Sequence, residues 1–398
     1  MNSRQRLLAS LTGEPPDRVP WEPLVDEYFL SSLPEAFQRQ HLGTPPFRVG
    51  SFSPGGCDGA AAGDGLTGRT RYRRAADFTR MIGADVFGIH APGLTCRVDD
   101  LVMEEIPHGQ KVVRRWITSA GVISDTISRV PESAAYPFYG EEYRVKTVAD
   151  LRVCRHIWEN TSYELDAAAF LEAEAYIGDD GIAVMDGPQS AVQLLLGEIT
   201  GVMSFYHLLQ DHPVEMEALI ETMHSRIRKA YEWLAQSPSR VILAMEDLSS
   251  TTSSPRIFRR FSWRHLNEYA DILHAGGKVF LAHMCGRLKA MAPLIAQSGL
   301  DGVESLTSPP IGDLSIAEAR ALWGEERVIV GGLNAGLMLE TDQGRVREAV
   351  LDALRQAAPG RNFVLSNADA MPSGANLDTL RTITEVIREC GSFPLRDL

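Results

Sequence analysis

A histidine and a cysteine separated by one residue, His283 and Cys285, close the apolar run in KVFLAHMCGR at residues 278–287. Both side chains are common zinc ligands. Side chains alternate between the two faces of a β-strand, so residues i and i+2 point the same way and this pair would project together from one strand end. The spacing therefore predicts a zinc site. The alternative is a hydrogen-bonded core histidine beside a small buried cysteine.

Two carboxylates that could complete this metal site end later apolar segments. Catalytic zinc sites use about three protein ligands drawn from His, Cys, Asp and Glu, and keep one position open for water or substrate. Glu304 in DGVESLT and Asp369 in SNADAMP are the candidates. Either one also has a simpler interpretation, an ion pair with an arginine for Glu304 and a turn cap for Asp369. The predicted metal ligands are His283, Cys285, Glu304 and Asp369.

Three other carboxylates are candidates for acid–base catalysis. Glu246 and Asp247 are adjacent at the end of an apolar run, so strand alternation lets only one of them point toward a common site. A salt bridge to a loop arginine is the alternative role for that residue. Asp186 precedes Gly187-Pro188 and could bind substrate, although Asp-Gly-Pro is also ordinary turn sequence.

All these residues lie at the ends of predicted strands, and so do His90, Asn334 and Asn367. We assign the two asparagines to cofactor binding. Eight apolar segments alternate with helical patterns, which is typical of parallel βαβ units and of a (β/α)8 TIM barrel. A doubly wound open sheet is the alternative, but no glycine fingerprint follows the first strand. The predicted strands are 18–25, 84–90, 182–188, 241–248, 278–285, 301–307, 327–335 and 362–372.

Two segments interrupt this repeat. Residues 26–76 are rich in Gly, Pro and Ser and predict an irregular, lid-like excursion, while residues 111–130 alternate around Ala120-Gly121 and predict a β-hairpin insertion after the second strand. The whole chain, 1–398, is expected to form a single domain of this barrel type. In such a barrel the carboxyl ends of the strands carry the active site, so the polar residues named above should face one mouth.

Composition limits the classes of partner. The net charge of −13, from 39 basic and 52 acidic residues, opposes binding to nucleic acid or to an anionic membrane. No apolar run approaches the roughly 20 residues that span a bilayer, and the first residues lack a signal-peptide core. Five scattered cysteines suit reduced thiols better than a disulfide framework. We therefore expect a cytoplasmic protein with small-molecule or protein partners, a homodimer among them.

The chain resembles the uroporphyrinogen decarboxylase superfamily, and within it the zinc-dependent corrinoid methyltransferases. Residues 3–20, 82–88 and above all 246–306, which contain the HxC motif, carry the resemblance. In such methyltransferases the HxC motif and a later cysteine bind zinc, which implies His283 and Cys285 here. The similarly folded cobalamin-independent methionine synthases add a glutamate about one βα unit later, where Glu304 stands.

The chain departs from these relatives at two places. SNADAMP contains no cysteine where the methyltransferases have their second one, so Asp369 occupies the approximate position and an oxygen ligand would favour oxygen partners. The decarboxylases have an arginine-rich motif after the first strand, whereas WEPLVDEYFLSSLPE has no arginine. Porphyrinogen decarboxylation is therefore not expected.

Three hypotheses follow from the motif and the resemblance. The first is a zinc-dependent methyltransferase that moves a methyl group between a small substrate, a methyl ether or a thiol, and a corrinoid (methylcobalamin) carried on a separate protein. The second is a cofactor-independent decarboxylase or lyase of a small carboxylic acid, with Asp186 or Asp247 as proton donor. The third is a non-catalytic homologue that binds a corrinoid protein.

Overall fold

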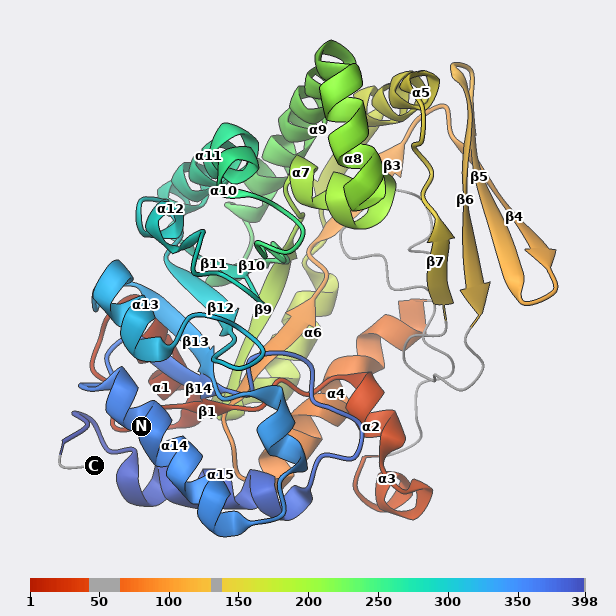
Figure 1. Ribbon diagram of the computed structural model, residues 1–398. Coiled ribbons are helices and arrows are strands. Elements are labelled where there is room, and N and C mark those ends of the chain that lie inside the picture. Colours follow the sequence, from red (N-terminus) through yellow and green to blue (C-terminus); the bar gives the residue numbers. More distant parts are fainter. Residues whose placement is uncertain (43–64, 130–137, 397–398) are drawn as a thin grey trace.

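The computed structural model describes residues 1–42, 65–129 and 138–396 (Figure 1). Its centre is a parallel eight-stranded sheet in the order β1, β14, β13, β12, β11, β10, β9, β2. The two edge strands meet, because the Asp85 amide donates to the Trp21 carbonyl at 2.8 Å. The predicted (β/α)8 barrel is therefore confirmed. The strands are β1 Trp21–Glu22, β2 Val86–Ala91, β9 Gly181–Gly187, β10 Val241–Ala244, β11 Val279–His283, β12 Gly302–Leu306, β13 Val328–Gly332 and β14 Phe363–Ser366.

Every predicted barrel strand is present, but several are shorter than predicted. Strand β1 has two residues because Pro20 and Pro23 flank it and proline has no amide hydrogen for the ladder. Strand β10 ends at Ala244, β11 at His283 and β14 at Ser366. The polar residues that follow these ends therefore lie in the loops of the barrel mouth.

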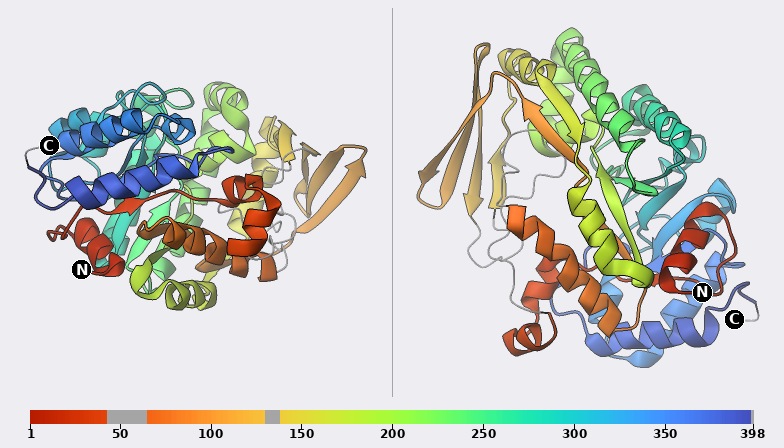
Figure 2. Two further views of the ribbon diagram at one scale, coloured as in Figure 1. Left: turned by 90° about the horizontal axis from the view of Figure 1, so that it is seen from below. Right: turned by 180° about the vertical axis from the view of Figure 1, so that it is seen from behind.

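Helices surround the barrel and alternate with its strands (Figures 1 and 2). The outer helices are α4 Gly65–Met81, α6 Ala168–Ile177, α7 Ala191–Leu194, α8 Gly201–Asp211, α9 Pro213–Leu234, α10 Pro255–Ile257, α11 Trp263–Ala275, α12 Ala292–Ala296, α13 Ile316–Trp323, α14 Gln343–Ala357 and α15 Leu377–Cys390.

The insertion after β2 is larger than the predicted hairpin. The hairpin itself is present as β5 Lys111–Thr118 and β6 Gly121–Arg129, within a four-stranded antiparallel sheet that also contains β4 Val102–His108 and β7 Phe138–Glu142. This sheet stands away from the barrel (Figure 2). A two-stranded sheet, β3 Leu94–Val98 with β8 Thr161–Leu165, and helix α5 Val148–Glu159 connect it to the barrel.

The prediction of irregular structure for residues 26–76 is wrong at both ends of that segment. Helices α2 Glu27–Ser32 and α3 Glu35–His41 follow β1, and α4 begins at Gly65. The Asp26 side chain caps α2, and Arg74 of α4 forms a buried ion pair with Glu27, Nε to Oε1 3.1 Å. Tertiary contacts of this kind stabilise short helices that composition alone does not indicate. Residues 43–64 lie outside the described part.

The interior of the barrel is apolar. Side chains of alternate strand residues form an inner cluster that includes Val184, Leu243, Leu281, Val330 and Val364. Leu7 and Leu11 of helix α1, Ser3–Thr12, belong to the same cluster, so α1 closes the amino-terminal end of the barrel. Among the described residues, the carboxyl end is therefore the end that α1 leaves uncovered.

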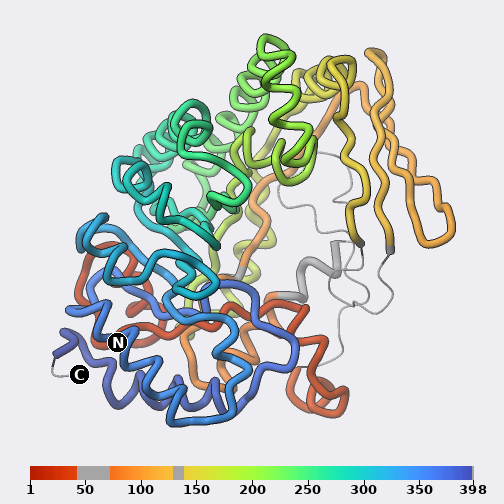
Figure 3. Tube along the Cα trace, in the orientation of Figure 1, coloured from red at the N-terminus to blue at the C-terminus, as the bar shows by residue number. Residues whose placement is uncertain are grey.

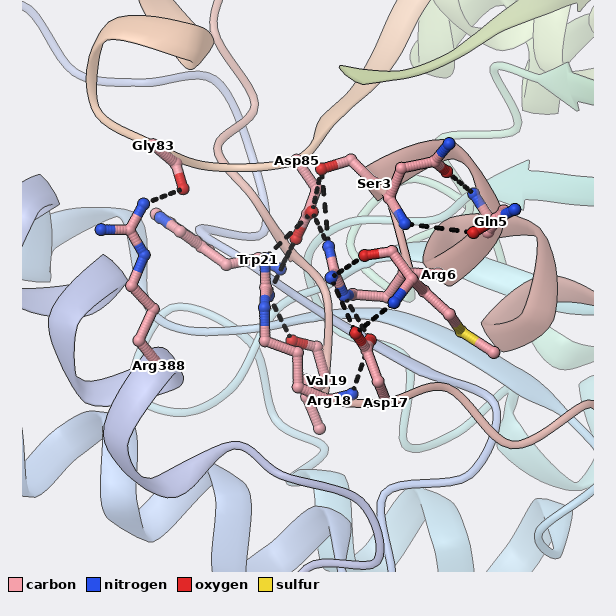
Figure 4. Close-up of polar contacts among 12 residues, drawn as sticks. Ser3, Gln5, Arg6, Asp17, Arg18, Val19, Trp21, Gly83, Asp85 and Arg388 are labelled. Carbon is pink, nitrogen blue, oxygen red and sulfur yellow. Dashed lines mark hydrogen bonds and ion pairs between the residues drawn. The ribbon is translucent and has the colours of Figure 1, made fainter. Parts of the chain in front are cut away.

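Asp85 anchors this closed end (Figure 4). Its fully buried carboxylate binds Arg6 Nη1 at 2.7 Å and accepts hydrogen bonds from Ser3 Oγ at 2.6 Å and Trp21 N at 3.0 Å. Arg18 adds a further ion pair at 3.0 Å. One carboxylate thus joins α1, β1 and the start of β2. The N-terminal end of the chain lies beside this end of the barrel (Figure 3).

Two expectations drawn from composition, on membrane-spanning helices and on the state of the cysteines, can be compared with the described residues. No helix among them is long and apolar enough to cross a bilayer. Cys154, Cys285 and Cys390 are free, whereas Cys96 is disulfide-bonded. The prediction of reduced thiols is therefore wrong for Cys96.

Candidate active site

A layer of polar side chains lies on top of the apolar interior of the barrel. Asp186, His283 and Ser366 each come two residues after a member of the inner cluster and share its inward face. Glu22 and Glu304 also face inward, because their neighbours Trp21 and Val303 belong to the outer cluster under the helices. The carboxyl ends of β1, β9, β11, β12 and β14 therefore meet in one polar site.

His283 and Glu304 form a buried pair in this layer. They are direct neighbours across the β11–β12 ladder, and His283 Nδ1 lies 2.5 Å from Glu304 Oε2. Burial disfavours the imidazolium, but the Glu304 carboxylate and the Cys285 thiol raise the pKa of His283 well above its ordinary value. The sequence placed these residues one βα unit apart, and the structure brings them into contact.

Cys285 lies just past the end of β11 at the edge of the site. Its Sγ donates to Asp247 Oδ1 at 3.1 Å. Burial raises the pKa of the thiol, and the carboxylate of Asp247 adds to this effect against the opposing influence of His283. Of the adjacent carboxylates 246 and 247, it is therefore Asp247 that reaches the HxC motif.

His90 and Asp186 form a second pair in the mouth. His90 Nδ1 lies 2.6 Å from Asp186 Oδ1, and the side chains keep 32% and 42% of their surfaces exposed. Burial lowers the pKa of His90, but Asp186 and then Glu304 outweigh this and raise it, while His283 opposes them. The pair combines solvent access with a fixed imidazole, which suits proton transfer.

Glu22 is a site residue that the sequence reasoning missed. It is 1% exposed, and its carboxyl group interacts with the Ser366 side chain on β14, which favours the charged form. Burial, and then the nearby Glu304 carboxylate, raise the pKa of Glu22 well above its ordinary value. The available signal was its place at the carboxyl end of the first predicted strand.

Glu246 is directed away from the barrel interior. The preceding alternate residues Ile242 and Ala244 pack in the outer cluster, and the buried carboxylate accepts hydrogen bonds from Ser190 N and from Ser190 Oγ, the latter at 2.8 Å. Burial raises the pKa of Glu246 to about 7, although both hydrogen bonds from Ser190 oppose the shift. These contacts attach the end of β10 to the start of α7, and the catalytic role predicted for Glu246 stays a prediction.

The remaining predicted residues come from the loops after β13 and β14. Asn367 is fully buried and engaged within the protein, since Oδ1 accepts from Leu24 N at 2.7 Å and Nδ2 donates to the Asp369 carbonyl at 2.6 Å. Asp369 accepts from Ala370 N at 2.7 Å through Oδ1. Asn334 caps the turn that follows β13, while its buried Nδ2 has no partner among the described residues and the side chain borders a cavity of about 340 Å³.

A family model matches most of this chain. The model for uroporphyrinogen decarboxylase (URO-D) matches residues 128–390, which is most of the barrel. The chain belongs to the uroporphyrinogen decarboxylase family. The predicted resemblance to this family is thus confirmed.

A solved methyltransferase structure agrees with the fold of this URO-D family member, and a second, weaker match carries no argument. A methyltransferase from Methanosarcina mazei superposes with a TM-score of 0.62 at 16% identity, covering 98% of this chain and 99% of that one. A GH5_18 protein from Bifidobacterium longum subsp. infantis gives a TM-score of 0.34 at 14% identity over 56% and 66% of the two chains. Among curated proteins, none is similar enough in sequence to match.

The site of this URO-D protein contains donor types that suit zinc, but their arrangement is one of paired side chains. His283 contacts Glu304 and Cys285 contacts Asp247, whereas Asp369 is bonded within its own loop. Within residues 1–42, 65–129 and 138–396, no group of three or more His, Cys, Asp or Glu is placed to hold an ion. The imidazole of His283, the thiol of Cys285 and the Glu304 carboxylate are nevertheless donor types that zinc accepts, and they lie next to one another at the ends of β11 and β12.

Proposed function

We propose that this protein is a zinc-dependent methyltransferase that moves a methyl group between a small substrate and a corrinoid cofactor. The observation that carries the proposal is the contact of His283 with Glu304 next to Cys285, at the mouth of a URO-D family barrel. The overall likeness to a methyltransferase from Methanosarcina mazei supports it at the level of the fold.

His283, Cys285 and Glu304 are the residues that would hold the metal. Zinc supplies Lewis acidity, which stabilises negative charge on a substrate oxygen or sulfur during substitution at carbon. Asp369 was the fourth ligand predicted from the sequence, and its carboxylate is engaged with Ala370 N. One thiolate among oxygen and nitrogen donors makes a harder site than two thiolates, so we favour an ether or hydroxyl substrate over a thiol.

His90, Asp186 and Asp247 are the groups that would handle protons. The Asp186 carboxylate fixes the ring of His90 and favours its protonated form, so His90 is suited to donate a proton to a leaving oxygen. Asp247 accepts the thiol proton of Cys285 in a hydrogen bond and is placed to remove it. The side chains of His90 and Asp247 keep contact with solvent, which allows them to exchange protons between turnovers.

The corrinoid would come from outside the chain. Asn334 has an unpartnered amide beside a cavity and is the better of the two predicted contacts, because Asn367 uses both ends of its amide within the protein. A separate corrinoid protein is the expected partner.

The test is a spectrophotometric assay of methyl transfer with free corrinoid. Methyl phenyl ethers are offered to cob(I)alamin, and thiols and phenols to methylcobalamin, with the zinc-loaded protein. We expect turnover with an oxygen substrate that is lost in His283→Ala and retained in Cys390→Ser, whose thiol lies in the final helix. No turnover across the panel, or decarboxylation of a small acid that survives removal of metal, would contradict the proposal and favour a cofactor-independent decarboxylase.

A further inference from the structure

The place of Asp186 in the site depends on the backbone that carries it. Within the described part of the chain, its carboxylate has one hydrogen-bond partner, His90 Nδ1 at 2.6 Å. The side chain keeps 42% of its surface exposed, so packing does not fix it either. Whatever aligns Asp186 with His90 therefore acts through the end of strand β9, whose last residue is Gly187.

The hydroxyl of Tyr231 holds the chain immediately after this strand end. Tyr231 lies on helix α9, is fully buried, and donates a hydrogen bond to the Pro188 carbonyl at 2.8 Å. Gly187 leaves room for this contact, since a Cβ atom there would lie 2.8 Å from the Tyr231 hydroxyl oxygen. The sequence Asp186-Gly187-Pro188 thus places a functional carboxylate, a gap and an acceptor side by side.

The ring of Tyr231 is itself held in one orientation. It stacks on Tyr269 of α11, with ring centroids 4.2 Å apart and planes inclined by 7°, and it packs edge-on against Phe280 of β11 at 5.5 Å. Tyr269 is also fully buried, but its hydroxyl lies 2.8 Å from His224 Nδ1 on α9. The two tyrosines therefore form a matched pair, alike in packing and different in what their hydroxyls bind.

Glu246 supplies a second anchor for the same loop. Ser190, the residue before α7, donates both its amide and its hydroxyl to the Glu246 carboxylate, the hydroxyl at 2.8 Å. Serine at such a position commonly caps the helix, whereas this hydroxyl makes no capping bond. Both side chains are fully buried, where a lost hydrogen bond is costly. Residues 187–190 are thus fixed at two points behind the site.

We propose that Tyr231 is a positioning residue: its hydroxyl, together with Glu246, fixes residues 187–190 from behind and so holds the Asp186 carboxylate against His90. Tyr231 acts through the backbone, since its hydroxyl bonds Pro188 and no residue of the site. The proposal rests on the proposed function in taking His90 and Asp186 as groups that handle protons. A loose loop would weaken their contact, because hydrogen bonds depend steeply on distance and angle.

Titration of His90 by NMR of histidine-labelled protein tests this without substrate or metal. Three groups act on the pKa of His90, namely Asp186 from β9, Glu304 from β12 and His283 from β11. Tyr231→Phe removes the hydroxyl behind Asp186 and keeps the ring, and Tyr269→Phe is the matched control. We expect the pKa of His90 to fall toward its ordinary value in Tyr231→Phe and to stay as in wild type in Tyr269→Phe.

The outcomes separate this proposal from the proposed function. A merely structural role would lower the unfolding temperature of both variants and leave the titration of His90 unchanged. That result, or an equal shift in Tyr269→Phe, would overturn the positioning role and leave methyl transfer as proposed. A shift confined to Tyr231→Phe supports the role even if wild type shows no methyl transfer. If Tyr231→Phe does not fold, Ser190→Ala, which removes one bond to Glu246, is titrated instead, and an unchanged His90 would overturn the proposal.

Discussion

At the scale of single residues, the site is organised by pairs in which a carboxylate raises the pKa of a neighbouring histidine or cysteine. His283 with Glu304, His90 with Asp186 and Cys285 with Asp247 each join groups from different strands or loops. Perturbed titration of this kind is common at functional sites, because catalysis needs groups poised to gain or lose protons. The pair of His90 and Asp186 leads to the first experimental prediction.

The His90–Asp186 pair predicts a specific pH dependence. Asp186 raises the pKa of His90, with Glu304 acting in the same direction and His283 against it. If protonated His90 donates a proton to substrate, kcat/KM falls as pH rises through the pKa of His90. Asp186→Asn should move this alkaline limb to lower pH, because the imidazolium loses its nearest carboxylate. A pH–rate profile checks this, and a limb that does not move would exclude His90 as the proton donor.

Glu246 predicts a pH dependence of stability. Burial raises its pKa from 4.5 to about 7 in the folded protein, so the folded state holds the proton more tightly than the unfolded state. This contribution to the free energy of unfolding is fully present below about 4.5 and is lost as pH rises toward 7. In Glu246→Gln that decline should be smaller. Urea unfolding of both proteins at pH 5 and pH 7.5 measures the difference, and equal declines would show that Glu246 does not titrate in this range.

At the scale of elements, β1 and β2 show how backbone geometry positions a side chain. Gly88 and Gly277 both have left-handed φ angles, +67° and +69°, but a Cβ at Gly277 would meet nothing within 4 Å. Both alanine variants incur the backbone strain of roughly 1 kcal/mol. Gly88→Ala should lose more free energy of unfolding than this, because its Cβ would also displace the Glu22 carboxyl group. Equal losses in chemical denaturation would mean that Gly88 is not needed for the approach of Glu22.

The elements also show how far sequence reasoning extends. All eight strands were predicted because buried parallel strands are apolar runs between helices. The failures have physical causes as well. Pro20 and Pro23 shorten β1 relative to the predicted strand 18–25, so Glu22 is its last residue, and the helices at 27–41 depend on tertiary contacts.

The site itself was predicted less completely than the fold. The predicted site residues lie at or just after the ends of barrel strands, but the directions and partners of their side chains could not be read from the sequence. Asp369 has φ +142° and turns its carboxylate to the next amide, which no residue pattern indicates. Glu246 and Asp247 are adjacent in sequence, yet one binds Ser190 and the other Cys285.

At the scale of the whole molecule, stability and function are separated to the two ends of the barrel. The closed end is held by Asp85, Arg6 and Arg18 around an apolar interior, and the open end carries the polar site. This is the division expected for TIM barrels, in which loops at the carboxyl ends of the strands provide chemistry. The antiparallel sheet β4–β7 is an addition beside that framework.

Asp85→Asn should therefore destabilise the protein without altering the metal site. Removing the buried carboxylate charge takes an ion-pair partner from both Arg6 and Arg18, and the expected loss is about 3 kcal/mol in the free energy of unfolding. Glu35→Gln, which removes an exposed ion pair with Arg39, should change it by less than about 1 kcal/mol. Urea denaturation distinguishes the two, and similar small effects would mean that the Asp85 cluster is not an anchor.

The central claim is that the HxC motif of this URO-D barrel binds a catalytic metal. The most direct measurement is the metal content of the purified protein by plasma mass spectrometry, beside Cys285→Ser and the control Cys390→Ser. The account predicts about one zinc per chain in wild type and in Cys390→Ser, and a clear loss in Cys285→Ser. Protein that remains free of zinc after incubation with the metal, or a Cys285→Ser variant that retains it fully, would contradict the account.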